Sequence, residues 1–393
     1  MNNTQRLHAI MNYEKYDRMP LVVFGFWRET LLKWAEEGHI TIEDANNWGD
    51  GNATDHKINQ LLGFDFNWGG GLGFSGFLNP SFKSEVLEVL PDGSEIRRDS
   101  MGLITKSKPG VVSIPAHVGT TLKDRKAWEE EYLPRLRFFP ERVDGENIKR
   151  EYERLKGEDH PIYLHLGSLY GNVRNMVGVE ELSYLAVDDE ELYEEIVDTV
   201  DSLCYECVKE AMKLGLKFDY GHFWEDICFK TGPLLRPAVF GRLTGKWYKK
   251  ITDEMRAHGT DIISLDCDGK IDELVPIWLE NGVNTMFPIE VGTWNASIAP
   301  WREKYGPAIK GVGGMDKRVF SKDFKAVDAE IERLKPLIDL GGYIPCPDHR
   351  IAPDAKWDNV RYYCDRFRQE FGGRDGLASL RGLKALAQGF SIT

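Results

Sequence analysis

The chain alternates short apolar runs with long amphipathic stretches, and this alternation limits its fold more than any other feature. Seven short runs have the length of buried strands; they lie at residues 20–27, 161–166, 218–223, 261–265, 284–288, 308–312 and 342–346. The clearest helix-like stretches lie at residues 190–214, 237–258, 271–281, 322–340 and 355–371. Strands that alternate with helices predict βαβ units and a parallel sheet.

We predict an α/β fold, specifically a (β/α)8 TIM barrel, although only seven candidate strands can be placed and a barrel needs eight. A doubly wound sheet is the alternative. It would need a glycine-rich phosphate-binding turn, and the one candidate, at residues 69–73, is not preceded by a strand pattern. The barrel is predicted to be a single domain over residues 1–393, a length that can bury a substantial core.

The alternation breaks between residues 28 and 160, which predicts an inserted subdomain. Within it, residues 83–108 alternate apolar and polar side chains around Pro91, Asp92 and Gly93. An aspartate–glycine pair between such runs indicates a β-hairpin. The hairpin would either cover the mouth of the barrel or form a contact between two copies, so a homodimer is left open. Residues 373–393 are predicted to form a C-terminal tail.

The charge balance argues against some classes of partner. The chain has 63 acidic and 50 basic side chains and a net charge of −13, whereas nucleic acids and anionic membranes attract basic surfaces. No apolar run approaches the roughly 18 residues of a transmembrane helix, and the N-terminus lacks the apolar core of a signal peptide. Six cysteines are too few for a disulfide scaffold. We therefore expect a cytoplasmic protein that binds neither nucleic acid nor membrane.

Candidate metal ligands follow two of the predicted strands. In such barrels the reactive residues stand at the C-terminal ends of the strands. Asp266 and Asp268 are two residues apart and point to one face, while Cys267 points to the other. Cys346 and His349 follow the last strand, and carboxylate, thiolate and imidazole are all zinc ligands. The alternatives are that the two aspartates cap helices or bind water, and that Cys346 and His349 only pack in the core.

Candidate acids and bases follow two further strands. Glu225 and Asp226 are adjacent, so only one of them can face the barrel mouth. We expect Glu225 to be the inward, catalytic group and Asp226 to anchor the turn, because Asp226 begins the next segment. Glu290, after the fifth predicted strand, is either catalytic or a turn anchor.

Six short segments, most of them at predicted strand ends, together form a recognisable pattern. They are Arg18-Met19-Pro20, Glu225-Asp226, Lys230-Thr231-Gly232-Pro233-Leu234, residues 266–269, Pro288-Ile289-Glu290, and Gly341-Gly342-Tyr343-Ile344-Pro345-Cys346-Pro347-Asp348-His349. Over residues 12–371 the chain resembles the uroporphyrinogen decarboxylase superfamily. That resemblance implies a (β/α)8 barrel with its site at the C-terminal face.

The resemblance implies one of two activities, a cofactor-free tetrapyrrole decarboxylation or a methyl transfer that serves a corrinoid protein, usually with zinc. Decarboxylases of the family carry an arginine-rich segment after the first strand, and here only Arg28 remains in that stretch. A substrate with many carboxylates needs several cations to bind it, so the methyltransferase branch is favoured. In the family's zinc site, Asp266 and Asp268 would replace a histidine and a cysteine, and Cys346 would lie near a later cysteine. Carboxylate ligands suit a substrate whose methyl group is bonded to oxygen or nitrogen better than they suit a thiol substrate.

These inferences combine into a predicted activity. The chain is expected to be a zinc-dependent methyltransferase that moves a methyl group from a small methyl ether or methylamine, as in O-demethylation, to the cobalt of a corrinoid. The corrinoid would belong to a separate partner protein, zinc would act as a Lewis acid, and Glu225 or Asp226 would donate a proton. Two alternatives are a cofactor-free uroporphyrinogen decarboxylase and a binding protein without catalytic activity.

Overall fold

A parallel sheet lies at the centre of the computed structural model, which describes residues 1–108 and 115–372. Six strands pair in the order β14-β13-β12-β11-β8-β7, so each strand lies beside the next one along the chain. Their bounds are β7 (Tyr163–Gly167), β8 (Tyr220–Trp224), β11 (Ile263–Asp266), β12 (Thr285–Ile289), β13 (Lys310–Met315) and β14 (Tyr343–Pro347). The predicted mixed α/β architecture with a parallel sheet is confirmed.

Two further strands form a separate parallel pair. They are β1 (Val22–Val23) and β2 (Phe66–Asn67). Isolated parallel bridges join Phe26 to Ile351, beyond β14, and Leu72 to Leu164 of β7. Among the described residues, the eight parallel strands therefore lie in two ladders linked by single bridges, not in one continuous closed sheet. The seven predicted strands omit β2, so the segment at residues 69–73 follows a strand after all.

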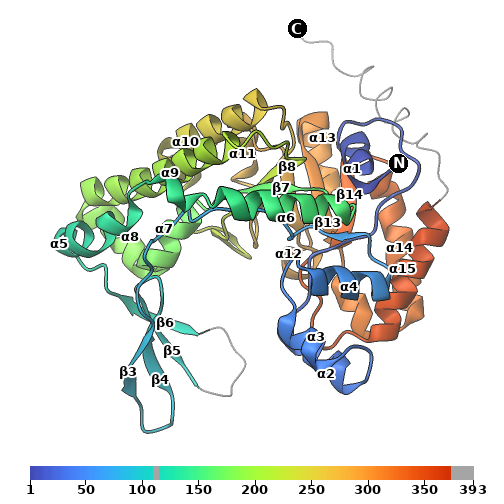
Figure 1. Cartoon of the computed structure of the whole chain (residues 1–393), viewed down its shortest axis with the longest axis horizontal. Helices are drawn as coiled ribbons and strands as arrows, with labels where there is room; N and C mark the ends of the chain where they lie inside the picture. Colours follow the sequence, from blue (N-terminus) through green and yellow to red (C-terminus); the bar gives the residue numbers. More distant parts are fainter. Residues whose placement is uncertain (109–114, 373–393) are drawn as a thin grey trace.

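Helices surround the parallel strands, as Figure 1 shows. Four of the five predicted helices match α9 (Glu190–Met212), α10 (Pro237–Ala257), α14 (Phe324–Ile338) and α15 (Trp357–Phe371), and the fifth is shortened to α11 (Val275–Glu280). Further helices are α6 (Gly145–Gly157), α7 (Tyr170–Val177), α8 (Val179–Asp188), α12 (Val291–Trp294) and α13 (Ile298–Tyr305). Within residues 1–108 and 115–372, no helix combines the length and apolar character needed to cross a bilayer.

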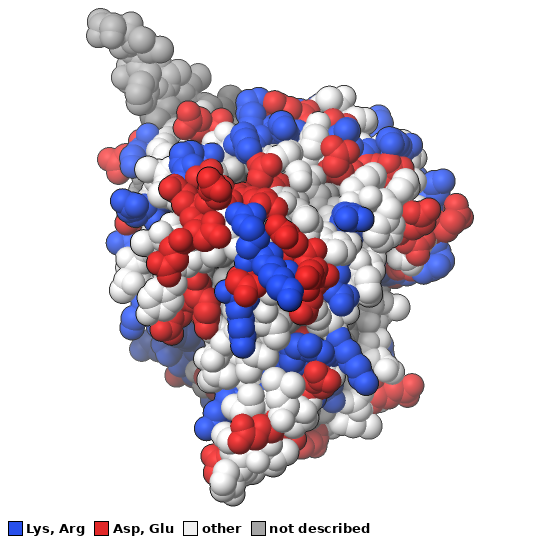
Figure 2. All heavy atoms as spheres, turned by 90° about the vertical axis from the view of Figure 1, so that its left-hand side faces the viewer, with Lys and Arg blue, Asp and Glu red and all other residues white. Residues whose placement is uncertain are grey.

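Opposite charges are interleaved on the outer helices. Arg242 of α10 pairs with Glu190 and Glu194 of α9, and Lys246 of α10 pairs with Asp198. Figure 2 shows acidic and basic side chains mixed over this side of the molecule. The described part of this face therefore presents no broad basic patch.

The inserted region contains more structure than the predicted hairpin. It holds α2 (Arg28–Glu36), α3 (Ile42–Asn47), α4 (Ala53–Leu62) and α5 (Arg125–Ala127). It also holds a four-stranded antiparallel sheet of β3 (Glu85–Val89), β4 (Glu95–Arg98), β5 (Leu103–Ser107) and β6 (Ala116–Thr120). The predicted hairpin is β3–β4; Gly93 at its turn has φ +79°, a conformation that glycine adopts without strain.

The antiparallel sheet projects from the body below α7 and α8 (Figure 1). It contacts the body at its base, where the Thr120 hydroxyl donates to the Met176 carbonyl at 3.0 Å. The division into a barrel and an inserted subdomain at residues 28–160 stays a prediction. The predicted tail at residues 373–393 lies outside the described residues.

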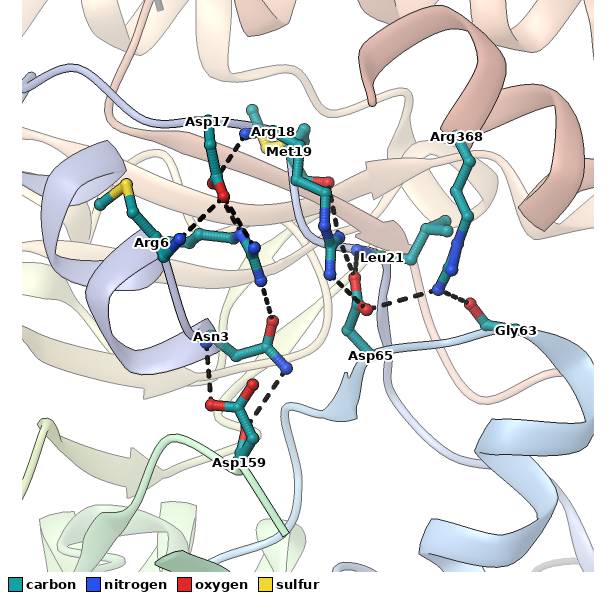
Figure 3. Close-up of polar contacts among 11 residues, drawn as sticks. Asn3, Arg6, Asp17, Arg18, Met19, Leu21, Gly63, Asp65, Asp159 and Arg368 are labelled. Atoms are coloured by element: carbon teal, nitrogen blue, oxygen red, sulfur yellow. Dashed lines mark hydrogen bonds and ion pairs between the residues drawn. The ribbon is translucent and has the colours of Figure 1, made fainter. Parts of the chain in front are cut away.

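The N-terminal ends of the strands are held together by paired charges and by α1 (Asn3–Met11), as Figure 3 shows. Arg18 donates two hydrogen bonds to Asp65, at 2.6 and 2.8 Å, and the Leu21 backbone N–H donates to the same carboxylate at 2.7 Å. Leu21 precedes β1 and Asp65 precedes β2, so this carboxylate joins the starts of both strands. Arg6 of α1 makes a similar two-bond pair with Asp17.

Candidate functional site

A cavity of about 510 Å³ lies at the C-terminal ends of the parallel strands. Aromatic, imidazole and carboxylate side chains dominate its wall. The lining residues are Phe24, Trp27, Asp50, Gly69, Tyr163, His165, His222, Trp224, Asp226, Asp266, Asp268, His349 and Arg350. A pocket of this size can enclose a small organic molecule.

Three carboxylates converge in this cavity. Asp226 follows β8, Asp266 ends β11 and Asp268 comes two residues later; one oxygen of each lies within 4.8 Å of the others. The parallel register that sets Asp266 opposite Trp224 brings the two segments together. The Asp268 backbone N–H donates to Asp226 Oδ1 at 3.0 Å. Asp266 and Asp268 both line the cavity, while the buried Cys267 thiol accepts a hydrogen bond from Ile227 N–H at 3.4 Å.

The carboxylates repel one another in a poorly solvated place. Burial, followed by the charge of Asp268, raises the pKa of Asp226 to about 6. Burial and the charge of Asp226 raise the pKa of Asp266 well above its usual value. Asp268 Oδ1 is buried and has no hydrogen-bond partner within the described structure. Clustered acids of this kind are stabilised by a bound cation, which offsets both the repulsion and the lost hydration.

His349 lies beside the carboxylates. Its Nε2 is 3.3 Å from Asp268 Oδ2, and its ring stacks on Trp27 at 5.7 Å and meets the edge of Phe24 at 5.6 Å. His349 Nδ1 is buried and has no partner among the described residues. The imidazole is therefore oriented by aromatic packing next to the acids and can offer a nitrogen ligand.

Cys346 is not part of this group. It lies inside β14, opposite Gly314, and is fully buried. Burial raises the pKa of its thiol well above the usual value, and it does not line the cavity. Among the described residues, the cluster of ligand atoms contains Asp226 where the sequence predicted Cys346. Cys346 precedes the end of its strand, whereas the clustered side chains stand at or after theirs.

The expected orientation of Glu225 and Asp226 is wrong. Glu225 is fully buried; it accepts hydrogen bonds from Leu169 N–H at 2.9 Å, Gly171 N–H at 2.8 Å and the Tyr248 hydroxyl at 2.5 Å. Burial raises the pKa of Glu225 to about 7. Asp226, with a left-handed φ of +50°, directs its carboxylate into the cavity. The longer side chain thus anchors the turn between β7 and α7, and the shorter one faces the cavity.

Glu290 occupies a turn-anchoring position. Its carboxylate accepts Gly269 N–H at 2.6 Å and the Thr293 hydroxyl at 2.7 Å. Burial raises its pKa. Gly269 directly follows Asp268, so Glu290 holds in place the turn that carries one of the clustered acids. It does not line the cavity itself.

His165 and His222 line the cavity but are not among the site residues predicted from the sequence. They face each other across β7 and β8, with ring centroids 6.4 Å apart. A signal for them exists in the sequence. Polar or aromatic side chains recur at every second position of these two strands, at Tyr163 and His165 and again at His222 and Trp224, which is the period of one strand face.

Comparisons with known proteins bear on the fold. No family model matches the sequence, and no curated protein matches it either. Among solved structures, a methyltransferase from Methanosarcina mazei aligns over 94% of this chain and 99% of that chain, with 16% identity and a TM-score of 0.57. A protein assigned as a vitamin-B12 independent methionine synthase from Listeria monocytogenes covers 91% of this chain and 98% of that chain at 15% identity, with a TM-score of 0.39. The chain therefore shares the fold of the first protein.

Proposed function

We propose that this chain is a metal-dependent methyltransferase that takes a methyl group from a small oxygen- or nitrogen-methylated donor. The acceptor would be the cobalt of a corrinoid carried by a separate protein. The observation that carries the proposal is the cluster of Asp226, Asp266 and Asp268 beside His349 in an aromatic cavity. The fold shared with a methyltransferase supports it, as does the resemblance in sequence. The strand order supports a (β/α)8 barrel, in which the site lies at the C-terminal ends of the strands.

The residues of the cluster fit a divalent cation. We assign Asp226, Asp266 and Asp268 as oxygen ligands because their oxygens converge and Asp268 Oδ1 lacks a partner in the described structure. We assign His349 as the nitrogen ligand because its Nε2 lies 3.3 Å from Asp268 Oδ2. Oxygen and nitrogen ligands suit Zn²⁺, the metal predicted from the sequence, and also Mn²⁺. When bound, the cation would supply Lewis acidity toward the atom that loses its methyl group.

The neighbouring glutamates would position the ligands. Glu225 is held by three hydrogen bonds and fixes the end of β8 just before Asp226. Glu290 fixes Gly269 just after Asp268. We propose a positioning role for both, in place of the acid–base role predicted for Glu225. Phe24, Trp27 and Trp224 would exclude water from the methyl group by enclosing it.

The cavity's charge disfavours the alternative of tetrapyrrole decarboxylation. Among the described lining residues, Arg350 is the one arginine or lysine. It already donates to Asp50 at 2.6 and 3.1 Å. Arg28, the remnant of the family's arginine-rich segment, donates instead to Asn46. A substrate with several carboxylates would meet acids here and no free cation.

Metal analysis of the purified protein combined with a methyl-transfer assay tests the proposal. We expect about one divalent ion per chain, since one cluster of ligand atoms lies within the described residues. Cob(I)alamin absorbance should fall as methyl-cobalt forms from a methylated donor. A protein that transfers methyl groups at full rate after complete chelation of its metal would overturn the metal assignment. Transfer of the methyl group to homocysteine with no corrinoid present would show that a corrinoid is not the required acceptor.

Variants separate the ligand set from its neighbours. Asp266→Asn and Asp268→Asn change two ligands of the carboxylate cluster, and His349→Ala removes the imidazole beside it, so each variant should lose most of the metal. Cys346→Ser is the matched control. The set predicted from sequence requires this variant to lose metal, whereas the geometry, with Cys346 outside the cavity, requires it to keep metal.

A further inference from the structure

Two histidines line a part of the cavity wall to which the clustered carboxylates do not contribute. His165 and His222 are partners in the register of β7 and β8, and both side chains line the cavity. His222 pairs in register with Ser264, two residues before Asp266, and Asp226 lies beyond the end of β8. The imidazoles therefore lie nearer the N-terminal ends of the strands than the acids do. A ligand whose methyl group reaches the acids can therefore have its other end at the histidines.

Burial favours the uncharged form of both imidazoles. His165 Nδ1 accepts the Gly167 backbone N–H at 3.0 Å, so the ring proton of the neutral form is on Nε2. Burial lowers the pKa of His165 to about 4, and burial together with His165 lowers the pKa of His222 to about 3. His222 is 4% exposed, and its Nδ1 has no hydrogen-bond partner within the described structure. This unpartnered ring nitrogen is the kind of buried polar group that a ligand satisfies.

The surrounding groups complete a polar but uncharged floor. The Tyr163 hydroxyl donates to the Gly69 carbonyl at 2.7 Å, which leaves its oxygen as an acceptor. Its ring lies 5.0 Å from that of His222. An anionic group here would meet no free cation, because Arg350, which also lines the cavity, already pairs with Asp50. It would also face the acids at the mouth. An ammonium group would lose its hydration opposite neutral rings.

We infer that His165 and His222 bind an uncharged oxygen of the methyl donor, a hydroxyl or a carbonyl group at the end remote from the methyl group. The inference rests on the proposed function and narrows its substrate class to neutral methylated compounds. His165 would donate from Nε2, and His222 would use its unpartnered nitrogen. Methylated acids and methylated ammonium compounds would be excluded by the cost of burying their charge at this floor.

Calorimetric titration with three matched compounds tests this directly in the purified full-length protein. The compounds are 4-methoxybenzyl alcohol, 4-methoxybenzoate and 4-methoxybenzylammonium, which differ mainly in the charge of one end. We expect the alcohol to bind at least about tenfold more tightly than either ion. Equal or tighter binding of the benzoate or the ammonium compound overturns the inference.

Substitutions of the two histidines test whether they cause the preference for the neutral alcohol. His165→Leu and His222→Leu should each weaken alcohol binding by roughly tenfold, whereas His165→Gln and His222→Gln, which keep a neutral donor and acceptor, should stay within about threefold of the original protein. His258→Leu, a substitution at an exposed histidine on the outer surface, should change nothing. A purely packing role would make the glutamine variants as weak as the leucine variants, and that result would contradict the inference.

The titrations also separate this inference from the proposed function. Suppose that the alcohol binds in a histidine-dependent way but no methyl group is transferred to cob(I)alamin. That result would contradict the proposed methyltransferase function and support the binding site at the histidines. If methyl groups are transferred from donors whose affinity is unchanged by substitution of either histidine, the proposed function is supported and the binding site at the histidines is contradicted.

Discussion

The two ends of the parallel strands carry the same residue type in opposite electrostatic settings. At the N-terminal end, Asp65 accepts hydrogen bonds from Arg18, Arg368 and a backbone N–H. At the C-terminal end, Asp226, Asp266 and Asp268 converge on one another. Paired charges hold strands together, whereas clustered like charges cost stability and are retained where a ligand offsets them. The comparison separates the N-terminal end, which stabilises the fold, from the C-terminal end, which we propose binds the metal and the substrate.

The largest effect is expected on turnover at the C-terminal end. Asp268→Asn should lower methyl transfer by roughly 100-fold or more, together with metal content, since even outer partners of metal ligands cost 10–100-fold. Metal analysis and initial rates measure both quantities. Asp253→Asn, at an acid of α10 that pairs with Lys249, is the control. An Asp268→Asn protein that loses metal but keeps its rate would show that the cluster does not serve catalysis.

Next in size is a loss of stability at the N-terminal end. Asp65→Asn leaves Arg18 without its charged partner and weakens the bond to Leu21 N–H, so it should cost about 2–4 kcal/mol of unfolding free energy. Urea unfolding followed by circular dichroism measures this. Asp328→Asn should cost far less, because that acid is 42% exposed where it pairs with Arg366. Activity per folded molecule should be unchanged in both variants. A loss of activity per folded molecule in Asp65→Asn would contradict a purely stabilising role for the N-terminal end.

A smaller effect is expected in how stability depends on pH, with opposite signs for Asp17 at the N-terminal end and for the buried Asp201 of α9. The hydrogen bond from Arg6 holds the pKa of Asp17 below its usual value. Its stabilisation is therefore present above the unfolded-state pKa and is lost as the pH falls through the folded-state pKa. Because Asp17 is 42% exposed, solvent screening keeps its contribution below about 1 kcal/mol.

Asp201, buried in α9 behind Glu225, has the opposite dependence. Burial, with the charge of Glu225, raises its pKa well above the usual value, and neither of its oxygens has a partner in the described structure. Its contribution is complete below the unfolded-state pKa and is lost as the pH rises through the folded-state pKa. Unfolding titrations across pH should lose the acid-side slope in Asp17→Asn and the alkaline-side slope in Asp201→Asn. Identical profiles for both variants would contradict the assignment.

The smallest effect is expected from the ring that packs on His349. Trp27→Ala removes the stacking contact at 5.7 Å and should weaken metal binding by roughly two- to tenfold without lowering the melting temperature. Competition with a fluorescent chelator gives the affinity. Phe324→Ala removes a similar exposed stack, on Tyr362, away from the cavity, and should not alter the affinity. An unchanged affinity in Trp27→Ala would show that Phe24 alone orients the imidazole.

Most of the secondary structure could be predicted because it follows local periodicity. The long amphipathic stretches became α9, α10, α14 and α15, and six of the seven apolar runs became the strands of the main sheet. β2 escaped prediction because it is only two residues long, Phe66 and Asn67, too short for a period to show. The antiparallel sheet was only half predicted, since β3 and β4 are joined by an aspartate–glycine turn and β5 and β6 are not.

The sequence by itself determined that Asp266 and Asp268 share a face and that Cys267 does not, because side chains of an extended chain alternate. Tertiary structure alone decided which other groups join them. The register of β8 against β11 brings Asp226 to Asp268, and the turn after β7 binds Glu225 and turns it away from the cavity. The alternation of an extended chain is set within a few residues by backbone geometry, whereas convergence depends on how strands far apart in the chain pack against one another.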